Sequence, residues 1–289
     1  MSPDPRQIKA LALDLDGTTL LPDSTLGGRT AAIIKKLISR GIQIIIATGR
    51  TMETSEIYLS ALGARGPMVF VNGAVITDVP SNKILYINML DLDIVDFGID
   101  LARKNDYHYQ IYMPAGVSPY TGEADPSIKM GQPVIEKKRP ESDFYRKHTG
   151  TTMLEQDFKK VVALPGLKGC LKAMFICDSI YHDDIRKEFT DRFADRVSVM
   201  RSSSTFLEIL NSGVSKGEGL KIVMKYRGLK PEEVIAFGDE ENDLSMFKAA
   251  GFSAAPASGK EHVREAAEII YGSAAEEGLA VYLEELFKF

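Results

Sequence analysis

Short apolar runs alternate with amphipathic segments over the first 80 residues, a pattern typical of strands that are each followed by a helix. The apolar runs at residues 8–13 and 42–47 predict two strands, and residues 30–40 between them predict a helix with one apolar face. The second run is unbroken, as expected for a parallel strand that helices cover on both faces. Residues 68–71 predict a third strand, followed by a turn at residues 72–73.

The pattern of residue types changes at about residue 84, where polar and aromatic residues alternate irregularly. Residues 114–140 predict a proline-containing loop. Further elements are expected in this stretch: helices at 94–104 and 181–193, and strands at 171–176 and 206–210. This mixture indicates an inserted α+β module.

After residue 211 the earlier alternation returns, with a helix at 216–226, a buried strand at 234–237 and a helix at 244–250. We therefore predict an α/β fold built as two domains, one at residues 1–83 and 211–289, and the other at 84–210. A chain of 289 residues is long enough for that division.

The amino-acid composition limits the classes of molecule that the protein is expected to bind. Hydrophobic residues make up 44% of the chain and charged residues 26%, as in ordinary globular proteins. The net charge of −5 offers no basic surface for nucleic acid, so we expect none as a partner. Two cysteines are too few for a disulfide framework, and no apolar run approaches the roughly 20 residues that span a bilayer. We expect an unexported, cytoplasmic protein without a membrane partner.

Two aspartates, Asp14 and Asp16, follow directly after the first predicted strand. Ligands of open α/β sheets bind at the carboxyl ends of the strands, so these carboxylates fall where a site is expected. Two like charges there also call for a cation such as Mg²⁺. The structural alternative is a plain loop in which Asp14 caps a turn and Asp16 helps to form it.

Thr48 and Gly49 follow the strand predicted at 42–47. A hydroxyl and a backbone N–H at that place can bind a phosphate, and the N-terminus of a following helix would reinforce the binding. The alternative is that Thr48 is a helix N-cap. Two interpretations also stay open for Arg50, which either reaches toward a substrate or the insert, or lies on the surface at the start of a helix.

Lys216 stands at the start of a predicted helix, against the helix dipole, which indicates an acidic partner. The alternative is an exposed lysine beside the N-cap residue Ser215. Residues 238–243 carry four acids within six residues, directly after the strand predicted at 234–237. Their place at a strand end favours metal binding over a solvated acidic loop.

Taken together, these four segments resemble the four motifs of the haloacid dehalogenase superfamily in their order along the chain. The phosphatase branch has DxDGT, Thr, Lys and GDxxND, which match residues 14–18, Thr48, Lys216 and residues 238–243. Residues 209–217, 243–251 and 277–280 resemble the Cof-type subgroup. The resemblance implies a Rossmann-like parallel-sheet core at 1–83 and 211–289, with an inserted α/β cap at 84–210.

The same resemblance implies the roles of individual residues in a magnesium-dependent phosphatase. Asp14 would attack phosphorus to form an aspartyl-phosphate, and Asp16 would act as the acid and base. The Mg²⁺ ion would be held by Asp14, the backbone carbonyl of Asp16 and Asp239, with Asp243 farther out and orienting Lys216. The residues that would hold the substrate phosphate are Leu15, Thr48, Gly49, Arg50, Lys216 and Asn242.

We expect hydrolysis of a small phosphorylated metabolite, with a sugar phosphate as one candidate. Two other functions stay open: transfer of the phosphoryl group to a second acceptor, as in phosphomannomutase-like relatives, and a regulatory protein that keeps the fold without catalysis. Asn72-Gly73 resembles an Asn-Gly of the family, but a plain turn explains it, so it is left outside the catalytic set. The sequence names neither the substrate nor the oligomeric state.

Overall fold

Five parallel strands form the central sheet of the structure, a computed structural model that describes residues 3–289 except the side chain of His148. Their order across the sheet is β14-β13-β12-β1-β2. The strands are β1 (Ala10–Leu13), β2 (Gln43–Ile46), β12 (Val234–Phe237), β13 (Phe252–Pro256) and β14 (Ile269–Tyr271). Leu13 at the end of β1 lies opposite Phe237 of β12 and Ile46 of β2. The segments that follow these three strands therefore meet at one edge of the sheet.

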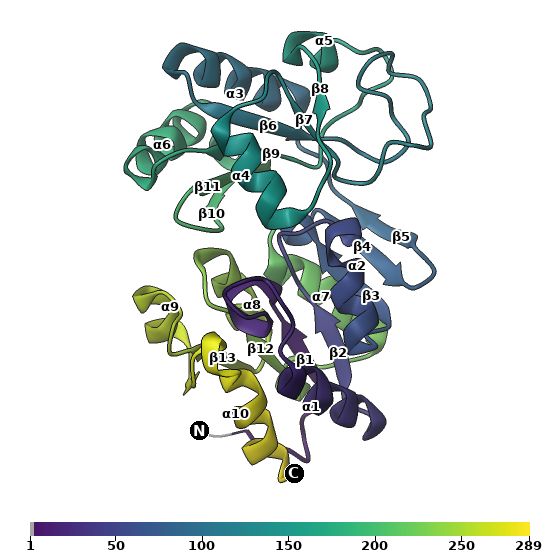
Figure 1. Cartoon of the computed structure of the whole chain (residues 1–289), viewed down its shortest axis with the longest axis vertical. Helices are drawn as coiled ribbons and strands as arrows, with labels where there is room; N and C mark the ends of the chain where they lie inside the picture. The colour runs from purple at the N-terminus through teal and green to yellow at the C-terminus, as the bar shows by residue number, and fades with distance from the viewer. Residues whose placement is uncertain (1–2) are drawn as a thin grey trace. The chain divides into compact units, whose positions relative to one another are not determined.

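Helices cover this sheet on both faces (Figure 1), which explains why β1 and β12 are apolar at every position. The helices of this part are α1 (Gly28–Ser39), α2 (Met52–Leu62), α7 (Lys216–Arg227), α8 (Leu244–Ala249), α9 (Glu261–Ala266) and α10 (Gly278–Phe287). Apolar side chains of α7 and α8 pack with alternate residues of β1, β2 and β12, such as Ala12, Ile45 and Ala236. On the opposite face, the ring of Tyr282 from α10 contacts the ring of Phe237.

A separate antiparallel sheet follows α2, made of β3 (Gly66–Phe70), β4 (Val75–Val79) and β5 (Lys83–Ile87). The sequence predicted that the third strand would run to residue 71, and this boundary is wrong. Val71 has a φ of +51°, in the left-handed region, and begins the tight turn Val71–Gly73 instead. A single parallel bridge between Ala47 and Val69 links this small sheet to the end of β2.

The chain divides into two compact units, which we call the core unit and the insert unit. The core unit consists of Met1–Gly49, Ser55–Tyr86 and Ser215–Phe289, and the insert unit of Arg50–Thr54 and Ile87–Val214. The chain thus leaves the core unit and returns to it.

A third sheet, of six strands in the order β10-β11-β9-β6-β7-β8, lies in the insert unit. Its strands are β6 (His108–Tyr112), β7 (Pro133–Ile135), β8 (Leu154–Glu155), β9 (Lys172–Ile176), β10 (Val197–Arg201) and β11 (Phe206–Asn211). Its helices are α3 (Leu92–Asn105), α4 (Pro140–Thr149), α5 (Phe158–Val162) and α6 (His182–Phe193). The predicted loop at 114–140 contains β7, a three-residue strand too short to give a periodic signal.

The two faces of this six-stranded sheet carry different kinds of side chain. Ile111, Phe175 and Ile209 point into an apolar core with side chains of α3 and α6. On the opposite face of the sheet lies a buried ion pair. Nζ of Lys172 is 2.5 Å from Oε2 of Glu208, and each residue is only 2% exposed. Because a charged pair is costly to bury, both partners have to be present for the pair to be tolerated.

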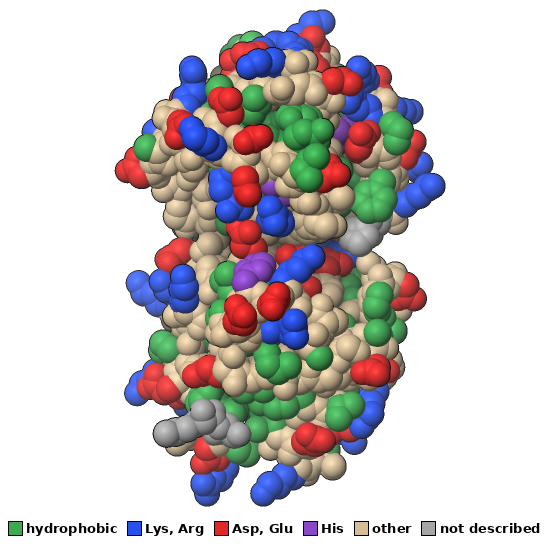
Figure 2. Space-filling view, turned by 90° about the vertical axis from the view of Figure 1, so that its left-hand side faces the viewer, with side chains coloured by type: hydrophobic (Ala, Val, Ile, Leu, Met, Phe, Trp, Pro, Cys, Tyr) green, Lys and Arg blue, Asp and Glu red, His purple; other side chains and the backbone are tan. Residues whose placement is uncertain are grey.

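Acidic and basic side chains are interspersed on the face of the molecule shown in Figure 2. Among residues 3–289, none of the helices has the length and apolar character needed to cross a bilayer.

Candidate active site

The first acidic segment turns sharply at the end of β1, over residues Leu15–Thr19. Gly17 has a φ of +74°, and a Cβ atom at this position would lie 2.2 Å from Oδ2 of Asp239. Glycine is therefore needed both for the backbone conformation and for the close approach of Asp239. The hydroxyl of Thr18 donates a hydrogen bond to Oδ1 of Asp239 at 2.8 Å, so this turn is fixed against the segment that follows β12.

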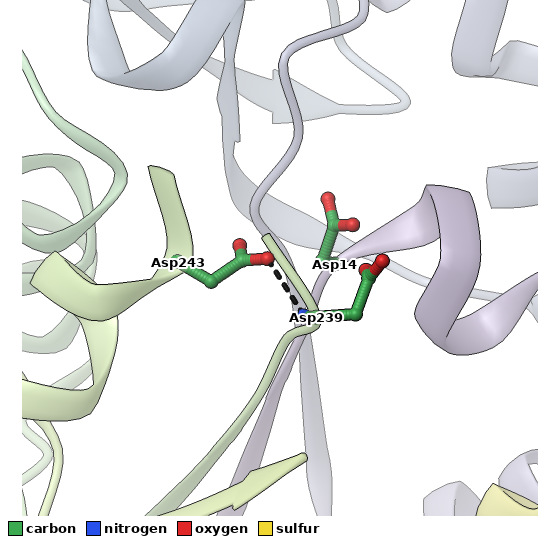
Figure 3. A group of neighbouring side chains, drawn as sticks. All are labelled: Asp14, Asp239 and Asp243. Carbon is green, nitrogen blue, oxygen red and sulfur yellow. Dashed lines mark hydrogen bonds between the residues drawn. The ribbon is translucent and has the colours of Figure 1, made fainter. Parts of the chain in front are cut away.

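Three carboxylates meet at the sheet edge: those of Asp14, Asp239 and Asp243 (Figure 3). Each offers an oxygen atom within 4.8 Å of the others. Asp243 is completely buried, and its Oδ2 accepts hydrogen bonds from the backbone N–H groups of Asp239 at 2.9 Å and Glu240 at 3.1 Å. Backbone donors thus fix the orientation of one member of this acidic cluster.

Lys216 lies against the acidic cluster and is 1% exposed. Its Nζ is 2.6 Å from Oδ1 of Asp14 and 2.7 Å from Oδ1 of Asp243. The alternative of an exposed lysine is therefore wrong, although Ser215 does cap α7, since its hydroxyl accepts from the backbone N–H of Glu218 at 3.1 Å. Two carboxylates explain why a lysine occupies this helix start against the dipole.

Burial dominates the electrostatics of the acidic cluster. It raises the pKa of Asp14 well above the ordinary value, opposed by the charge of Lys216 and assisted by Asp243 and Asp239. Burial likewise raises the pKa of Asp239 to about 7. For Lys216, burial lowers the pKa, but Asp14 and Asp243 outweigh it and the pKa is raised overall. The ammonium group therefore stays charged.

The donor set of this cluster fits a divalent metal ion. If all three carboxyl groups were ionised, one ammonium would leave two negative charges uncompensated at this place. Carboxylate oxygens gathered in this way are ligands for hard cations such as Mg²⁺ and Ca²⁺. A bound dication would neutralise the excess charge and return the carboxyl groups to their ionised form.

Asp16 lies two residues beyond Asp14 in the same turn and is half-buried. Its side chain is not part of the three-carboxylate group, and the expectation that its backbone carbonyl binds the metal stays a prediction. Leu15, which was predicted to contact the phosphate, is fully buried, and its carbonyl accepts from the backbone N–H of Leu20 at 2.8 Å.

Thr48 and Gly49 follow β2 at the same sheet edge as Asp14, because the N–H of Ala47 bonds the carbonyl of Leu13 at 2.9 Å. Thr48 is fully buried, and α2 begins only at Met52, so the alternative of a helix N-cap is wrong. Arg50 is 8% exposed and belongs to the insert unit, which contradicts the alternative of a surface arginine. Its predicted contact with the substrate stays a prediction.

Asn242 is 7% exposed in the turn Glu241–Asp243, and its Nδ2 donates to Oδ1 of Asn72 at 3.0 Å. Asn72 was left outside the predicted site because Asn-Gly is common in plain turns. Its complete burial shows that this turn is not a plain surface turn. One feature of the sequence could have indicated a role for Asn72. Like Asp14 and Thr48, it directly follows a predicted strand of the N-terminal part of the chain.

The sequence profile of the haloacid dehalogenase-like hydrolase family matches residues 11–283, nearly the whole chain. The chain belongs to this family. The prediction of a haloacid dehalogenase-type phosphatase of the Cof type, and of its α/β fold, is thereby confirmed.

Several named relatives of this haloacid dehalogenase-like hydrolase are phosphatases. The 5-amino-6-(5-phospho-D-ribitylamino)uracil phosphatase of Bacillus subtilis is 27% identical, over 96% of this chain and 97% of its own. The HMP-PP phosphatase of an Enterobacter species is 28% identical, over 83% and 80%. The crystal structure of a haloacid dehalogenase-like hydrolase from Bacteroides thetaiotaomicron covers 97% of this chain and 100% of its own, with 27% identity and a TM-score of 0.80.

Proposed function

We propose that this chain is a magnesium-dependent phosphatase that hydrolyses a small phosphate monoester through an aspartyl-phosphate on Asp14. The observation that carries the proposal is the pairing of a buried carboxylate with a buried ammonium. Lys216 holds Oδ1 of Asp14 at 2.6 Å, while Oδ2 has no hydrogen-bond partner among the described residues. One oxygen is therefore fixed and the other is available to react.

In the first step, an oxygen of Asp14 attacks phosphorus as the bond to the substrate oxygen breaks. Asp16, in the same turn, gives its proton to the leaving alkoxide. In the second step, Asp16 takes a proton from water, and the water oxygen attacks phosphorus, which releases inorganic phosphate and restores the carboxylate of Asp14. The ammonium of Lys216 compensates charge on the carboxylate and on the transferring group.

Mg²⁺ would be held by the carboxylates of Asp14 and Asp239 and by the backbone carbonyl of Asp16. Asp243 would lie farther from the metal and orient Lys216. When bound, the cation supplies positive charge for the phosphate oxygens. Asp243 contributes by accepting hydrogen bonds from two backbone N–H groups and from the ammonium of Lys216, which hold its carboxylate in place. Thr48, Gly49 and Asn242 would hold phosphate oxygens from the neighbouring strand ends.

The substrate class that we propose is a small phosphorylated metabolite. The two relatives described above are named after phosphorylated substrates of this kind. Each alignment covers most of this chain and most of the relative. We propose further that the insert unit is the cap of the enzyme and that Arg50, which belongs to it, contributes to substrate binding.

A panel of phosphorylated metabolites incubated with the purified protein tests this function. Release of inorganic phosphate from at least one monoester is expected with Mg²⁺ present, and none after chelation. Asp14→Asn keeps the size of the side chain and removes the nucleophile, so turnover should be lost. Unchanged turnover in this variant would refute the mechanism. Label recovered in a second sugar instead of free phosphate would indicate phosphoryl transfer.

A further inference from the structure

Tyr271, the last residue of β14, carries a buried hydroxyl group that the chemistry proposed above does not use. The residue is 5% exposed, and its hydroxyl has no hydrogen-bond partner among residues 3–289. Buried polar groups are nearly always paired, with other protein groups or with ordered water. A buried hydroxyl left over in this way therefore indicates a water molecule or a ligand beside it.

The strand register places Tyr271 at the same sheet edge as the acidic cluster. Phe237 of β12 lies opposite Ala254, and Pro256, two residues later on β13, lies opposite Tyr271. Tyr271 therefore stands level with the second residue after Phe237, which is Asp239. Because side chains alternate between the two faces of a strand, Tyr271 lies on the same face of the sheet as Phe237.

Neighbouring rings fix the position of the Tyr271 side chain. Its ring centroid is 5.8 Å from that of Phe237 and 6.0 Å from that of Tyr282 of α10. Asp239 is fixed as well, since its Oδ1 accepts a hydrogen bond from the hydroxyl of Thr18. Neither group is free to swing toward the other, so a small bridging molecule is needed to join them.

The charges of the acidic cluster distinguish the hydroxyl of Tyr271 from that of Tyr282. Burial raises the pKa of Tyr271 well above its ordinary value, and the three carboxylates of the cluster raise it further. For Tyr282, burial is the cause that raises the pKa to about 12. The hydroxyl of Tyr271 thus lies within electrostatic reach of the carboxylates, and it keeps the proton that it needs in order to donate.

We propose that Tyr271 is a positioning residue of the metal site, whose hydroxyl donates a hydrogen bond to a water molecule held against the carboxylate of Asp239. The water molecule in turn donates to that carboxylate, which favours its ionised form and fixes its orientation. The inference rests on the proposed function, because it needs a cation at Asp239. It assigns to the metal site a residue outside the four sequence motifs, on a strand that lies two places from β12 in the sheet.

Tyr271→Phe in the full-length protein tests this role, because it removes the hydroxyl and keeps the ring. Tyr282→Phe is the matched control, since it makes the same change in the ring that stacks on Tyr271. Calorimetric titration with Mg²⁺ gives the Kd of the metal for each variant. Steady-state kinetics at varied Mg²⁺ separate the metal requirement from the KM of the substrate. Circular dichroism gives the melting temperature in EDTA.

We expect Tyr271→Phe to raise the Kd for Mg²⁺ about 10-fold, as is usual when an outer hydrogen-bond partner of a metal ligand is removed. The Mg²⁺ concentration for half-maximal turnover should rise by the same factor. At saturating Mg²⁺, kcat and KM should stay near those of the wild type, because the hydroxyl touches no substrate. Tyr282→Phe should match the wild type in metal affinity and in turnover.

Equal Mg²⁺ affinity in the wild type and Tyr271→Phe would overturn the inference, even with a changed melting temperature, because that result belongs to a residue that only packs. An equal loss of affinity in both variants would also overturn it. A wild type that binds Mg²⁺ but hydrolyses no monoester would overturn the proposed function alone, since the titration needs no turnover. A wild type that binds no Mg²⁺ would overturn both.

Discussion

Replacement of Lys216 by methionine is the sharpest single perturbation of the acidic cluster. Methionine keeps an unbranched side chain of similar length and removes the ammonium group that lies 2.6 Å from Asp14 and 2.7 Å from Asp243. Three carboxylates, of which those of Asp14 and Asp243 are buried, then remain without this compensation. Removal of one partner of a buried ion pair costs about 3–5 kcal/mol, because the charge left behind stays out of water.

The lower end of that range applies to Lys216. The pKa of Asp14 and that of Asp239 are already raised, so the carboxyl groups can take up protons when the ammonium is absent. A loss of about 3 kcal/mol corresponds to a fall of roughly 6–12 °C in the melting temperature of a domain of this size. Added Mg²⁺ should restore more stability to Lys216→Met than to the wild type, since the variant has more negative charge to neutralise.

Thermal unfolding, monitored by circular dichroism in EDTA and then in Mg²⁺, checks these expectations. The control is Lys221→Met on the same helix, where a lysine with 55% of its side chain exposed pairs with Glu218. A surface pair contributes at most about 1 kcal/mol, so this control should melt near the wild type. If Lys216→Met melts together with Lys221→Met in EDTA, the argument from uncompensated buried charge is wrong.

Three further predictions concern other parts of the protein. Lys172→Met should destabilise the insert unit by about 3–5 kcal/mol in chemical denaturation, and Lys172→Met/Glu208→Leu should recover most of the loss; equal stability of single and double variants would contradict this. Gly17→Ala should weaken calorimetric Mg²⁺ binding about 10-fold or more by displacing Asp239, whereas Gly228→Ala, with a φ of +64° and open space around its Cβ, should leave binding unchanged. In EDTA, the melting temperature should rise as pH falls from roughly 8 to roughly 5, since the pKa of Asp239, raised by burial from 3.8 to about 7, makes the folded protein bind more protons than the unfolded chain. Mg²⁺ should flatten that dependence, and a melting temperature that falls on acidification in EDTA would argue against it.

The local pattern of the chain was enough to predict three of the five strands of the central sheet and the helices α1, α7 and α8. The strand predicted at 234–237 is β12, and the helix predicted at 216–226 differs from α7 by one residue. Apolar periodicity over ten or more residues is a local property, and each run carries it without help from the rest of the chain. Asp14, Thr48, Lys216 and Asp243 could be proposed as site residues because each stands at the end of a predicted strand or the start of a predicted helix.

The apolar periodicity of the sequence could not predict very short strands or the backbone conformation of single residues. The strands β7 and β8 have three and two residues and exist because they pair with other strands. The left-handed conformation of Val71 opposes its own preference and is held by tertiary contacts. For the same reason, the burial of Asn72 was missed.

By itself, the sequence determined which chemical groups are present, where several strands and helices of the core unit run, and to which family the motifs are similar. Only the tertiary structure decided which of these groups meet. Lys216 stands 202 positions from Asp14, and nothing local to either residue sets a distance of 2.6 Å between them. Parallel pairing of the strands gathers their carboxyl ends at one edge, and burial there turns scattered acids into a single charged cluster.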